Sequence, residues 1–367
     1  MSMSPKIKDD IIYWLALKQV QGIGNVIYKK LINAFNTPDR IFKAPIEELR
    51  KAEGIPESLL ERIKAFNNFE EHEKELQAIK HLDVSIITFN DESYPPLLKQ
   101  INDPPPYLYV KGDLSIKDNK VVAVVGTRYP SPYGQTATKE LAQRLVEEGY
   151  TIVSGMARGI DSMAHKSAID NKGRTVAVFG CGINVVYPES NKELSKKIID
   201  HGALMTEYPI NTPPLQMNFP ERNRIISGMS TALIVVEASL NSGTMITVSH
   251  ALDQGREVFA APGQIYSMMS QGTNRLIKHG ATMIDSIDTL IEELNNLTSF
   301  EDKDKRPQQV PDAYADILKY VSNEPVALDT VISQSNIETS KVMSILTEME
   351  LNGFVKQLPG KRYIKME

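Results

Sequence analysis

The middle of the chain alternates short apolar runs with helical patterns, and this alternation constrains the fold more than any other feature. Six runs are β-branched or apolar and end near Gly, Pro or Ser: VVAVVG, TIVSG, TVAVFG, ALMTEYP, TALIVVEA and EVFAAPG. Helical patterns, such as residues 136–148 and 245–254, lie between several of them. Continuous apolar strands separated by helices predict an α/β domain, namely a Rossmann-like, doubly wound, mostly parallel sheet covered on both faces. In such sheets ligands bind beyond the carboxyl ends of the strands.

The N-terminal region predicts a helical domain over residues 1–80. Apolar residues at helical spacing are interrupted by Gly-Ile-Gly at 22–24, and a second copy of the pattern is interrupted by Gly-Ile-Pro at 54–56. This arrangement resembles paired helix-hairpin-helix (SAM-like) motifs. Such turns can point backbone N–H groups at a DNA phosphate. The alternative is a compact helical bundle without DNA contact, which is favoured because Pro56 lacks an amide donor.

The rest of the chain is expected to form a large domain, a linker and a small C-terminal domain. The extended Rossmann-like domain is predicted over residues 81–297. The polar residues 298–312, which include two prolines, are expected to be a linker. Residues 313–367 show three helical patterns and a β-hairpin, which predicts a winged-helix domain. Its third helix, residues 340–351, carries one lysine and two glutamates, a composition that disfavours groove binding in DNA. Protein docking or structural support and sequence-specific DNA recognition remain the alternatives for this domain.

Composition limits the classes of function. The chain has 367 residues, is 41% hydrophobic and has a net charge of −5, so an anion must be bound by a local basic site rather than by the overall field. Cys181 is the only cysteine, and the six histidines are scattered, so we expect no disulfide and no metal site. No apolar run approaches the ~18 residues of a membrane span. We therefore expect a cytoplasmic protein without membrane contact.

The segments that follow the predicted strands carry residues suited to an anion. Glycines and hydroxyls can aim backbone N–H groups near helix starts, and arginine binds phosphate bidentately. Phe219 can stack on a base or can be a core residue. Asn223 and one of the two flanking arginines can instead brace the loop from inside, since alternate positions on an extended loop face opposite ways. We predict that five such loops meet at one edge of the sheet and bind DNA through Gly126, Thr127, Arg128, Ser154, Gly155, Arg158, Gly159, Lys192, Phe219, Arg222, Asn223, Arg224, Ser242, Gly243 and Thr244.

A dinucleotide cofactor is not expected in this fold. The segment GTRYPSPYG, which follows the first predicted strand, lacks the Gly-x-Gly-x-x-Gly fingerprint. Arg128 would also crowd a pyrophosphate that lies against the turn. We predict no cofactor.

The order and spacing of the motifs in residues 94–294 resemble the DNA-processing protein A family (DprA, also called Smf). The motifs are GTR, SGMARGID, GCGINVVYP, FPERNRIISG and the SGT segment. The resemblance implies single-stranded DNA binding, protection of incoming DNA, delivery of RecA during natural transformation, and a homodimer formed through the Rossmann-like domain. Carried over by motif, the DNA pocket corresponds to Gly126, Arg128, Ser154, Gly155, Lys192, Phe219 and residues 222–224. Gln216 departs from the pattern, because some relatives carry a basic residue there.

The alternative hypothesis is a nucleotide-processing enzyme. The domain also resembles the lysine-decarboxylase-like (LOG) phosphoribohydrolases, whose Gly-Gly-x-Gly-Thr-x-x-Glu motif supplies a catalytic glutamate. Thr247 stands at that position here, and a threonine cannot replace the carboxylate in acid–base chemistry at neutral pH. Glu207 and Glu237 lie near strand ends, where we expect them to pair with arginines. We therefore predict no catalytic residue and a protein that is not an enzyme.

Overall fold

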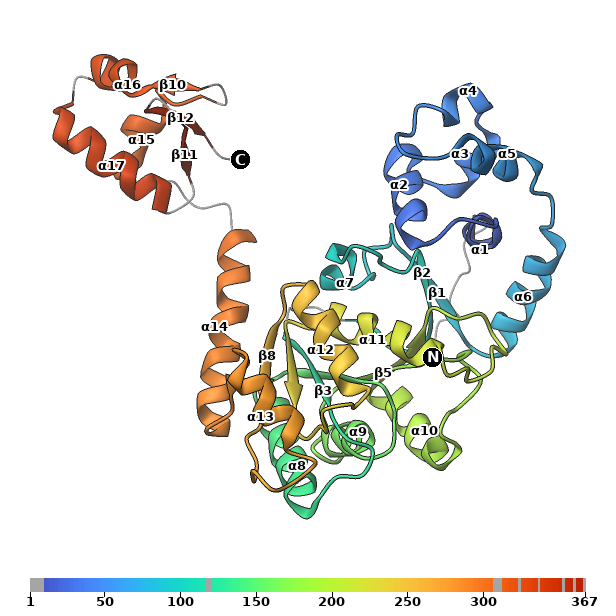
Figure 1. Cartoon of the computed structure of the whole chain (residues 1–367). Helices are drawn as coiled ribbons and strands as arrows, with labels where there is room; N and C mark the ends of the chain where they lie inside the picture. Colours follow the sequence, from blue (N-terminus) through green and yellow to red (C-terminus); the bar gives the residue numbers. More distant parts are fainter. Residues whose placement is uncertain are drawn as a thin grey trace. The chain divides into compact units, whose positions relative to one another are not determined.

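The computed structural model describes residues 10–115, 120–305, 312–322, 325–335, 337–351, 354–358 and 361–365. The chain divides into two compact units, Met1–Ser299 and Phe300–Glu367. The first unit contains a helical domain and a large α/β domain, and the second is small (Figure 1). No helix among the described residues is long and apolar enough to cross a membrane.

A nine-stranded sheet forms the centre of the first unit, with strand order β1-β2-β6-β5-β4-β3-β7-β8-β9. Strands β3 to β9 run parallel, whereas β1 and β2 add an antiparallel edge. The predicted doubly wound, mostly parallel sheet is thus confirmed, and the six predicted runs are β3 to β8. The bounds are β1 Ser85–Thr88, β2 Tyr107–Gly112, β3 Val121–Val125, β4 Thr151–Ser154, β5 Thr175–Val178, β6 Gly202–Thr206, β7 Ala232–Val235, β8 Glu257–Ala260 and β9 Thr282–Met283.

Alternate residues of the central strands enter two different hydrophobic cores. Along β3, Val121, Ala123 and Val125 face one core, whereas Val122 and Val124 face the other. Each strand is therefore buried on both faces, which is why its sequence is continuously apolar rather than alternating. Helices α8 (Pro132–Glu147), α9 (Ile160–Asp170) and α14 (Ile287–Lys305) cover one face, and α10 (Lys192–His201), α11 (Asn218–Gly228), α12 (Thr244–Asp253) and α13 (Gln271–Lys278) contribute to the other.

The strand order reverses beside β3. The connections from β3 through β6 run toward one edge of the sheet, and β7 then returns to the other side of β3. The loops that follow β3 and β7 therefore diverge above neighbouring strands. This switch point is where open α/β sheets leave a crevice for ligands.

The helical domain contains two helix pairs with tight glycine turns, as the sequence predicts. Gly22 and Gly54 have φ angles of 98° and 74°, which an L side chain rarely adopts. Trp14 stacks on Tyr28, whose hydroxyl donates to the Trp14 carbonyl at 3.0 Å. The helices are α1 Ile11–Gln19, α2 Asn25–Phe35, α3 Pro38–Lys43, α4 Ile46–Leu49, α5 Glu57–Ala65 and α6 Glu70–His81, and α7 Pro96–Gln100 follows between β1 and β2.

The second unit is a winged helix, as predicted, with a three-stranded sheet in the order β10-β12-β11. Its elements are α15 Asp312–Leu318, β10 Val326–Ala327, α16 Leu328–Ser335, α17 Thr339–Leu351, β11 Val355–Leu358 and β12 Arg362–Lys365. The predicted linker over 298–312 needs a correction at its start. Helix α14 continues to Lys305, because residues 298–305 contain no proline or glycine to stop it.

Candidate functional site

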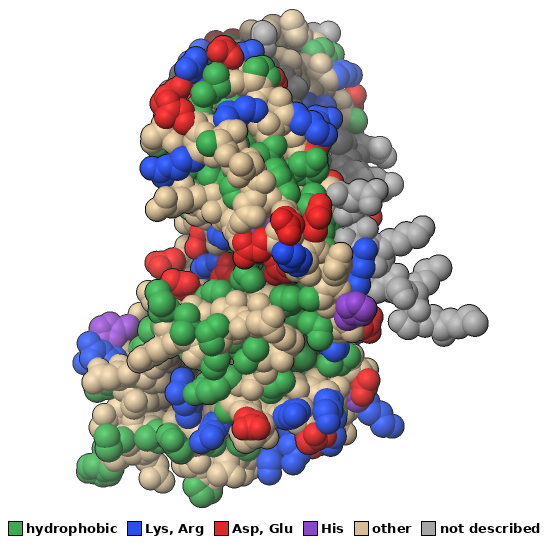
Figure 2. All heavy atoms as spheres, turned by 90° about the vertical axis from the view of Figure 1, so that its right-hand side faces the viewer, with side chains coloured by type: hydrophobic (Ala, Val, Ile, Leu, Met, Phe, Trp, Pro, Cys, Tyr) green, Lys and Arg blue, Asp and Glu red, His purple; other side chains and the backbone are tan. Residues whose placement is uncertain are grey.

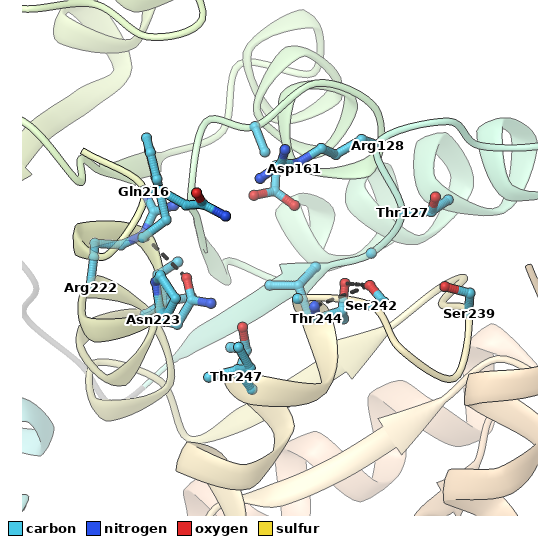
Figure 3. A pocket seen from close by; sticks show the side chains of 18 of the residues that line it. Thr127, Arg128, Asp161, Gln216, Arg222, Asn223, Ser239, Ser242, Thr244 and Thr247 are labelled. Carbon is cyan, nitrogen blue, oxygen red and sulfur yellow. Dashed lines mark hydrogen bonds between the residues drawn. The ribbon is translucent and has the colours of Figure 1, made fainter. Parts of the chain in front are cut away.

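A cavity of about 710 Å³ lies at the switch point, beyond the carboxyl ends of the parallel strands. Segments that follow β3, β4, β5, β6 and β7 all contribute to it, so the predicted convergence of five loops is present in the structure. Figure 3 shows Arg128 and Asp161 on one side, Ser242, Thr244 and Thr247 on the opposite side, and Gln216 and Arg222 at one end. The lining includes nine of the predicted residues: Gly126, Thr127, Arg128, Phe219, Arg222, Asn223, Ser242, Gly243 and Thr244.

Glu237 fixes the loop that carries Arg128. The Glu237 carboxylate accepts hydrogen bonds from the Ser131 backbone N–H at 2.9 Å and from the Ser131 hydroxyl at 2.6 Å, and its carbonyl accepts from the Thr127 N–H at 2.8 Å. Ser131 also caps α8, because its hydroxyl accepts from the Gly134 N–H. The expectation that Glu237 pairs with an arginine is therefore wrong. Its role is to hold the end of β7 to the loop after β3.

Arg128 is exposed at the cavity wall, and Figure 3 shows its side chain extending toward Asp161. Its side chain forms no ion pair with any residue that the structure describes. The backbone around it is tightly constrained, since a Cβ on Gly159 would lie 2.3 Å from the Thr127 carbonyl oxygen, and Gly159 has φ 79°. A solvent-facing arginine on a well-fixed loop is suited to bind an incoming phosphate.

The segment from Asn218 to Gly228 is a helix, not the extended loop that we expected. Phe219, Arg222, Asn223 and Ile226 line the cavity, and their spacing of i, i+3, i+4 and i+7 places them on one helical face. Arg224 therefore lies on a different face. The helical register, rather than the alternation of an extended chain, decides which arginine reaches the cavity.

Arg222 is a buried brace at the cavity wall, only 4% exposed. Its guanidinium donates to the carbonyls of Gly155, at 2.8 Å, and Val178, which lie at the ends of β4 and β5. Burial lowers the pKa of Arg222 to about 10, and the nearby Asp161 carboxylate opposes this shift. Burial also raises the pKa of Asp161, against the Arg222 charge and the Gly155 N–H at 3.1 Å. This arginine holds the strand ends together, which is the bracing role foreseen for one of the two arginines.

Arg224 does not line the cavity, and its prediction as a pocket residue is corrected. Its guanidinium forms ion pairs with Glu207 at 2.6 Å and with Asp103 at 3.1 Å. Glu207 thus pairs with an arginine, as expected. The two carboxylates neutralise this cation on the far side of α11 from the cavity.

Two aromatic rings form part of the cavity wall. Phe219 is half-buried, and its ring centre lies 5.4 Å from that of Tyr187 and 5.8 Å from the Arg222 guanidinium carbon. A Cβ on Gly180 would lie 2.9 Å from the Phe219 ring, so the ring packs closely on this turn. Phe219 is therefore packed from behind and still lines the cavity, which combines the two alternatives considered for it.

The start of α12 faces the cavity from the side of β7. The Ser242 hydroxyl accepts a hydrogen bond from the Thr244 N–H at 3.1 Å and donates to the Thr244 hydroxyl at 2.9 Å. The positive end of the helix dipole therefore lies in the cavity wall. Thr247 also lines the cavity one turn later, where the LOG motif requires a glutamate.

Six of the predicted residues are not part of the lining. Ser154 is buried, and its hydroxyl donates to the Val124 carbonyl at 2.7 Å. Gly155 leaves room for Arg222 and Asp161, because a Cβ there would lie within 2.9 Å of both. Arg224 and Gly159 have the positions described above. Arg158, on the loop after β4, and Lys192, at the start of α10, are exposed and lie outside the wall.

Sequence reasoning omitted several residues that line the cavity. Ser239 and Ile246 belong to the loop after β7 and to α12, and Tyr129 follows Arg128 directly. These three residues could have been predicted from the sequence, because each lies within a few positions of a predicted residue. Tyr187 and Pro214 come from long connections whose path the sequence does not specify.

A second recess, of about 1050 Å³, lies between the helical domain and the sheet. Its wall includes the first glycine turn, Gly22 and Gly24, together with Lys18, Arg224 and the carboxylates of Glu75, Asp103, Glu207 and Glu221. Figure 2 shows acidic side chains gathered at the junction of the two domains. We call this recess the interdomain cleft.

The first glycine turn packs against the α/β domain within this cleft. The Asn25 amide lies 3.4 Å from both the Asp103 carbonyl and the Glu207 carboxylate, and Lys29 donates to the Ile101 carbonyl at 3.0 Å. Surrounding carboxylates oppose a phosphate at this turn. This placement supports the alternative in which the first helical hairpin is structural.

These features define a class: a Rossmann-like α/β domain with an anion-suited cavity at its switch point, joined to a helix-hairpin-helix domain and a winged helix. The family model described as DNA recombination-mediator protein A matches residues 85–295. Models for the DprA winged-helix domain and a SAM-like helix-hairpin-helix tandem match residues 301–361 and 15–66. The chain belongs to the DprA/Smf family.

Relatives extend this result over the whole chain. Protein Smf of Synechocystis is 33% identical over 96% of this chain and 98% of its own length. The crystal structure of DNA processing protein A from Streptococcus pneumoniae has a TM-score of 0.66 and 34% identity over 79% of this chain and 99% of that one. A structure concerned with the single-stranded DNA binding mode of the Helicobacter pylori protein has a TM-score of 0.52 and 31% identity, over 58% of this chain and 96% of that one.

Proposed function

We propose that this protein binds single-stranded DNA in the switch-point cavity and acts as a recombination mediator. The observation that carries the proposal is the convergence of the solvent-facing Arg128, the start of α12 and the Phe219–Tyr187 pair in one cavity. Arg128 holds a phosphate beside the positive end of the α12 dipole, and the aromatic pair contacts a base. The Helicobacter pylori relative, studied for its single-stranded DNA binding mode, supports the same ligand class.

Single strands fit this site better than duplexes. The cavity is recessed among five loops, so a base must leave its stack to reach Phe219. Gln216 stands at the cavity end, where some relatives carry a basic residue, so one phosphate contact is either absent or supplied from elsewhere. Affinity therefore depends on few cations, and Arg128 is the main one.

We further propose that the protein protects incoming DNA and loads RecA onto it during natural transformation, in the cytoplasm. Membership in the recombination-mediator family supports this role. A homodimer formed through the α/β domain would place two cavities on one strand. The winged-helix domain, beginning near residue 300, is dispensable for binding in this proposal and serves docking.

The proposal assigns no catalytic step to the cavity. Thr247 supplies no carboxylate, and Asp161 is held by the Gly155 N–H beside Arg222. A nucleotide hydrolase would need an accessible acid–base group there. A test for base release from nucleoside monophosphates is expected to show none.

The decisive experiment is a salt-series titration that compares single-stranded with duplex DNA, with the protein mass measured in the same buffer. We expect tighter binding of the single strand at every salt concentration and a loss of affinity as salt rises. Adding RecA should give faster filament assembly on single strands with the protein than without it. Equal affinity for the two forms of DNA would contradict the proposal.

A further inference from the structure

One loop beside the cavity exposes large apolar side chains although its backbone is held firmly. In the segment between β8 and α13, the exposed fractions are 92% for Tyr266, 74% for Ile265 and 67% for Met268. Tyr129, which lines the cavity, is 76% exposed. These four residues, called the ledge below, are far more exposed than apolar side chains of a folded domain usually are.

The ledge loop is closed at its base. The Asn274 side-chain amide donates to the Gly263 carbonyl at 3.0 Å, and its oxygen accepts from the Gly263 N–H at 3.1 Å. Turns within the loop add hydrogen bonds from the Ser267 N–H to the Gln264 carbonyl and from the Ser270 N–H to the Ser267 carbonyl, each at 3.0 Å. The exposed side chains therefore extend from a shaped loop.

Three contacts tie this loop to the Thr127 side of the cavity. The Thr127 hydroxyl accepts from the Tyr129 N–H at 3.2 Å and lies 3.4 Å from the Met269 sulfur. The Ala238 N–H donates to the Met269 carbonyl at 2.8 Å. The Tyr133 hydroxyl donates to the Pro262 carbonyl at 2.8 Å. The ledge thus continues the wall formed by the loops after β3 and β7.

A polynucleotide in the cavity must leave it. A cavity of about 710 Å³ has the size of a site for a small ligand, so only a short part of a strand fits inside. In Figure 3 one end of the cavity is marked by Gln216 and Arg222, and the other by Thr127 and Ser239. The ledge begins at the second end, and no charged residue occurs from Gly263 to Asn274.

We propose that the ledge is a stacking surface for the nucleotides that leave the cavity at the Thr127 end. This inference rests on the proposed function and deepens it. Tyr129 and Tyr266 offer ring faces to bases, and Ile265 and Met268 offer flat apolar contacts that every base can use. Binding there is independent of sequence. It adds affinity only for strands longer than the cavity holds.

The test is the dependence of affinity on strand length. Fluorescent thymidine oligonucleotides of about 4 and about 20 residues bracket the site sizes of single-strand binders. Tyr266→Ala is expected to weaken binding of the long oligonucleotide about tenfold and to leave the short one unchanged. Tyr266→Phe should retain wild-type affinity, because the ring stacks. Leu252→Ala is the matched control, since Leu252 is 61% exposed at the far end of α12 and outside the cavity.

A spectroscopic readout reports contact directly. Trp14 is the only tryptophan and is buried in the helical domain, so Tyr266→Trp adds one exposed reporter. Its emission should be quenched by the long oligonucleotide and not by the short one, whereas Leu252→Trp should respond to neither.

The possible failures are separable. Wild-type protein that binds neither oligonucleotide sinks the proposed function. Intact wild-type binding together with unchanged long-strand affinity in Tyr266→Ala overturns only the ledge. A smaller mass of the assembly in solution for Tyr266→Ala than for wild type, with long-strand affinity unchanged, assigns the surface to contact with a second copy of the chain. This outcome also overturns the stacking proposal.

Discussion

Two recesses of the first unit contain similar groups and differ in their charge balance. Arg128, Arg222 and one carboxylate, Asp161, line the switch-point cavity. Two cations, Lys18 and Arg224, line the interdomain cleft, but four carboxylates surround them. Both recesses also include tight glycine turns. The comparison shows that a glycine turn with a nearby arginine is not enough to define a phosphate site.

The decisive difference is what each arginine already binds. Arg224 is paired with Glu207 and Asp103, and Arg222 is committed to backbone carbonyls beside Asp161. Arg128 alone among these three faces solvent. A cation that is already neutralised adds little to the binding of a further anion, whereas an exposed one retains its full attraction.

The largest effect is expected at Arg222. Arg222→Met should lower the free energy of unfolding by about 3–5 kcal/mol, because it leaves the Asp161 carboxylate buried without its counter-charge. Urea unfolding followed by circular dichroism measures this loss. Arg128→Met makes the same chemical change at an exposed site and should cost less than about 0.5 kcal/mol. Equal losses would mean that the two arginines have similar environments.

His165, which is buried in α9, gives a pH-dependent effect on stability. Burial, aided by the Arg222 charge, lowers the pKa of His165 to about 3, and the ring bonds to the Thr175 hydroxyl at 2.6 Å. Between about pH 6.5 and pH 3 the unfolded chain holds one more proton at this histidine than the folded chain. Stability should therefore fall by a few kcal/mol as pH drops through this window.

His165→Asn removes the titrating group and isolates this effect. Its unfolding free energy should depend less steeply on pH than that of the wild-type protein between pH 6.5 and 3. Above pH 7 the unfolding free energies of the two proteins should have the same dependence on pH. Parallel curves for the two proteins would show that His165 is protonated in the folded state.

Arg128 should dominate binding. Arg128→Ala is expected to weaken single-stranded DNA binding by about 1–3 kcal/mol, the range for a charged hydrogen-bonding group, without changing the unfolding midpoint. A gel-shift titration measures the affinity. Arg174→Ala is the matched control. Arg174 directly precedes β5, at the amino ends of the parallel strands and away from the cavity, and it pairs with Asp113. Similar losses in the two variants would remove Arg128 from the site.

A smaller effect is expected at Ser131. Ser131→Ala removes the cap of α8 and the hydroxyl that binds Glu237, and should cost about 1 kcal/mol of stability. Affinity for single-stranded DNA should fall because the loop that holds Arg128 loosens. The fall should be smaller than in Arg128→Ala, because the arginine itself is still present. Isothermal titration and thermal unfolding of one sample give both numbers. Affinity that falls without any loss of stability would assign Ser131 to DNA contact rather than to support.

The smallest effect on binding is expected at Arg224. Arg224→Ala should change affinity for single-stranded DNA by less than about 0.5 kcal/mol, since its charge is already neutralised on the far side of α11. It should still lower stability, because the half-buried Glu207 carboxylate loses its ion-pair partner. A tenfold loss of affinity with unchanged stability would place Arg224 in the DNA site and break the contrast between the recesses.

The sequence was sufficient for the architecture. Parallel strands that are buried on both faces are continuously apolar, so β3 to β8 stand out, and glycine turns mark the two helical hairpins. The convergence of five loops then follows from topology, since the carboxyl ends of parallel strands share one edge. β9 has only two residues, too few for any pattern to show.

The sequence was not sufficient to predict which charged side chains are already paired and which are available to bind a ligand. Phe219, Arg222 and Asn223 reach the cavity because α11 starts at Asn218, whereas an extended loop was expected for this segment. Glu237 binds Ser131, 106 residues away in the chain, a pairing that no local pattern encodes. Long-range partners of this kind decide whether an arginine is available.

The most direct test of this account is the salt dependence of single-stranded DNA binding in three proteins: wild type, Arg128→Ala and Arg224→Ala. Each phosphate contact contributes about 0.7 to the slope of log K against log salt for single strands. The account predicts that Arg128→Ala lowers the slope by about 0.7 and that Arg224→Ala leaves it unchanged. A slope that falls in Arg224→Ala and stays at the wild-type value in Arg128→Ala would contradict it.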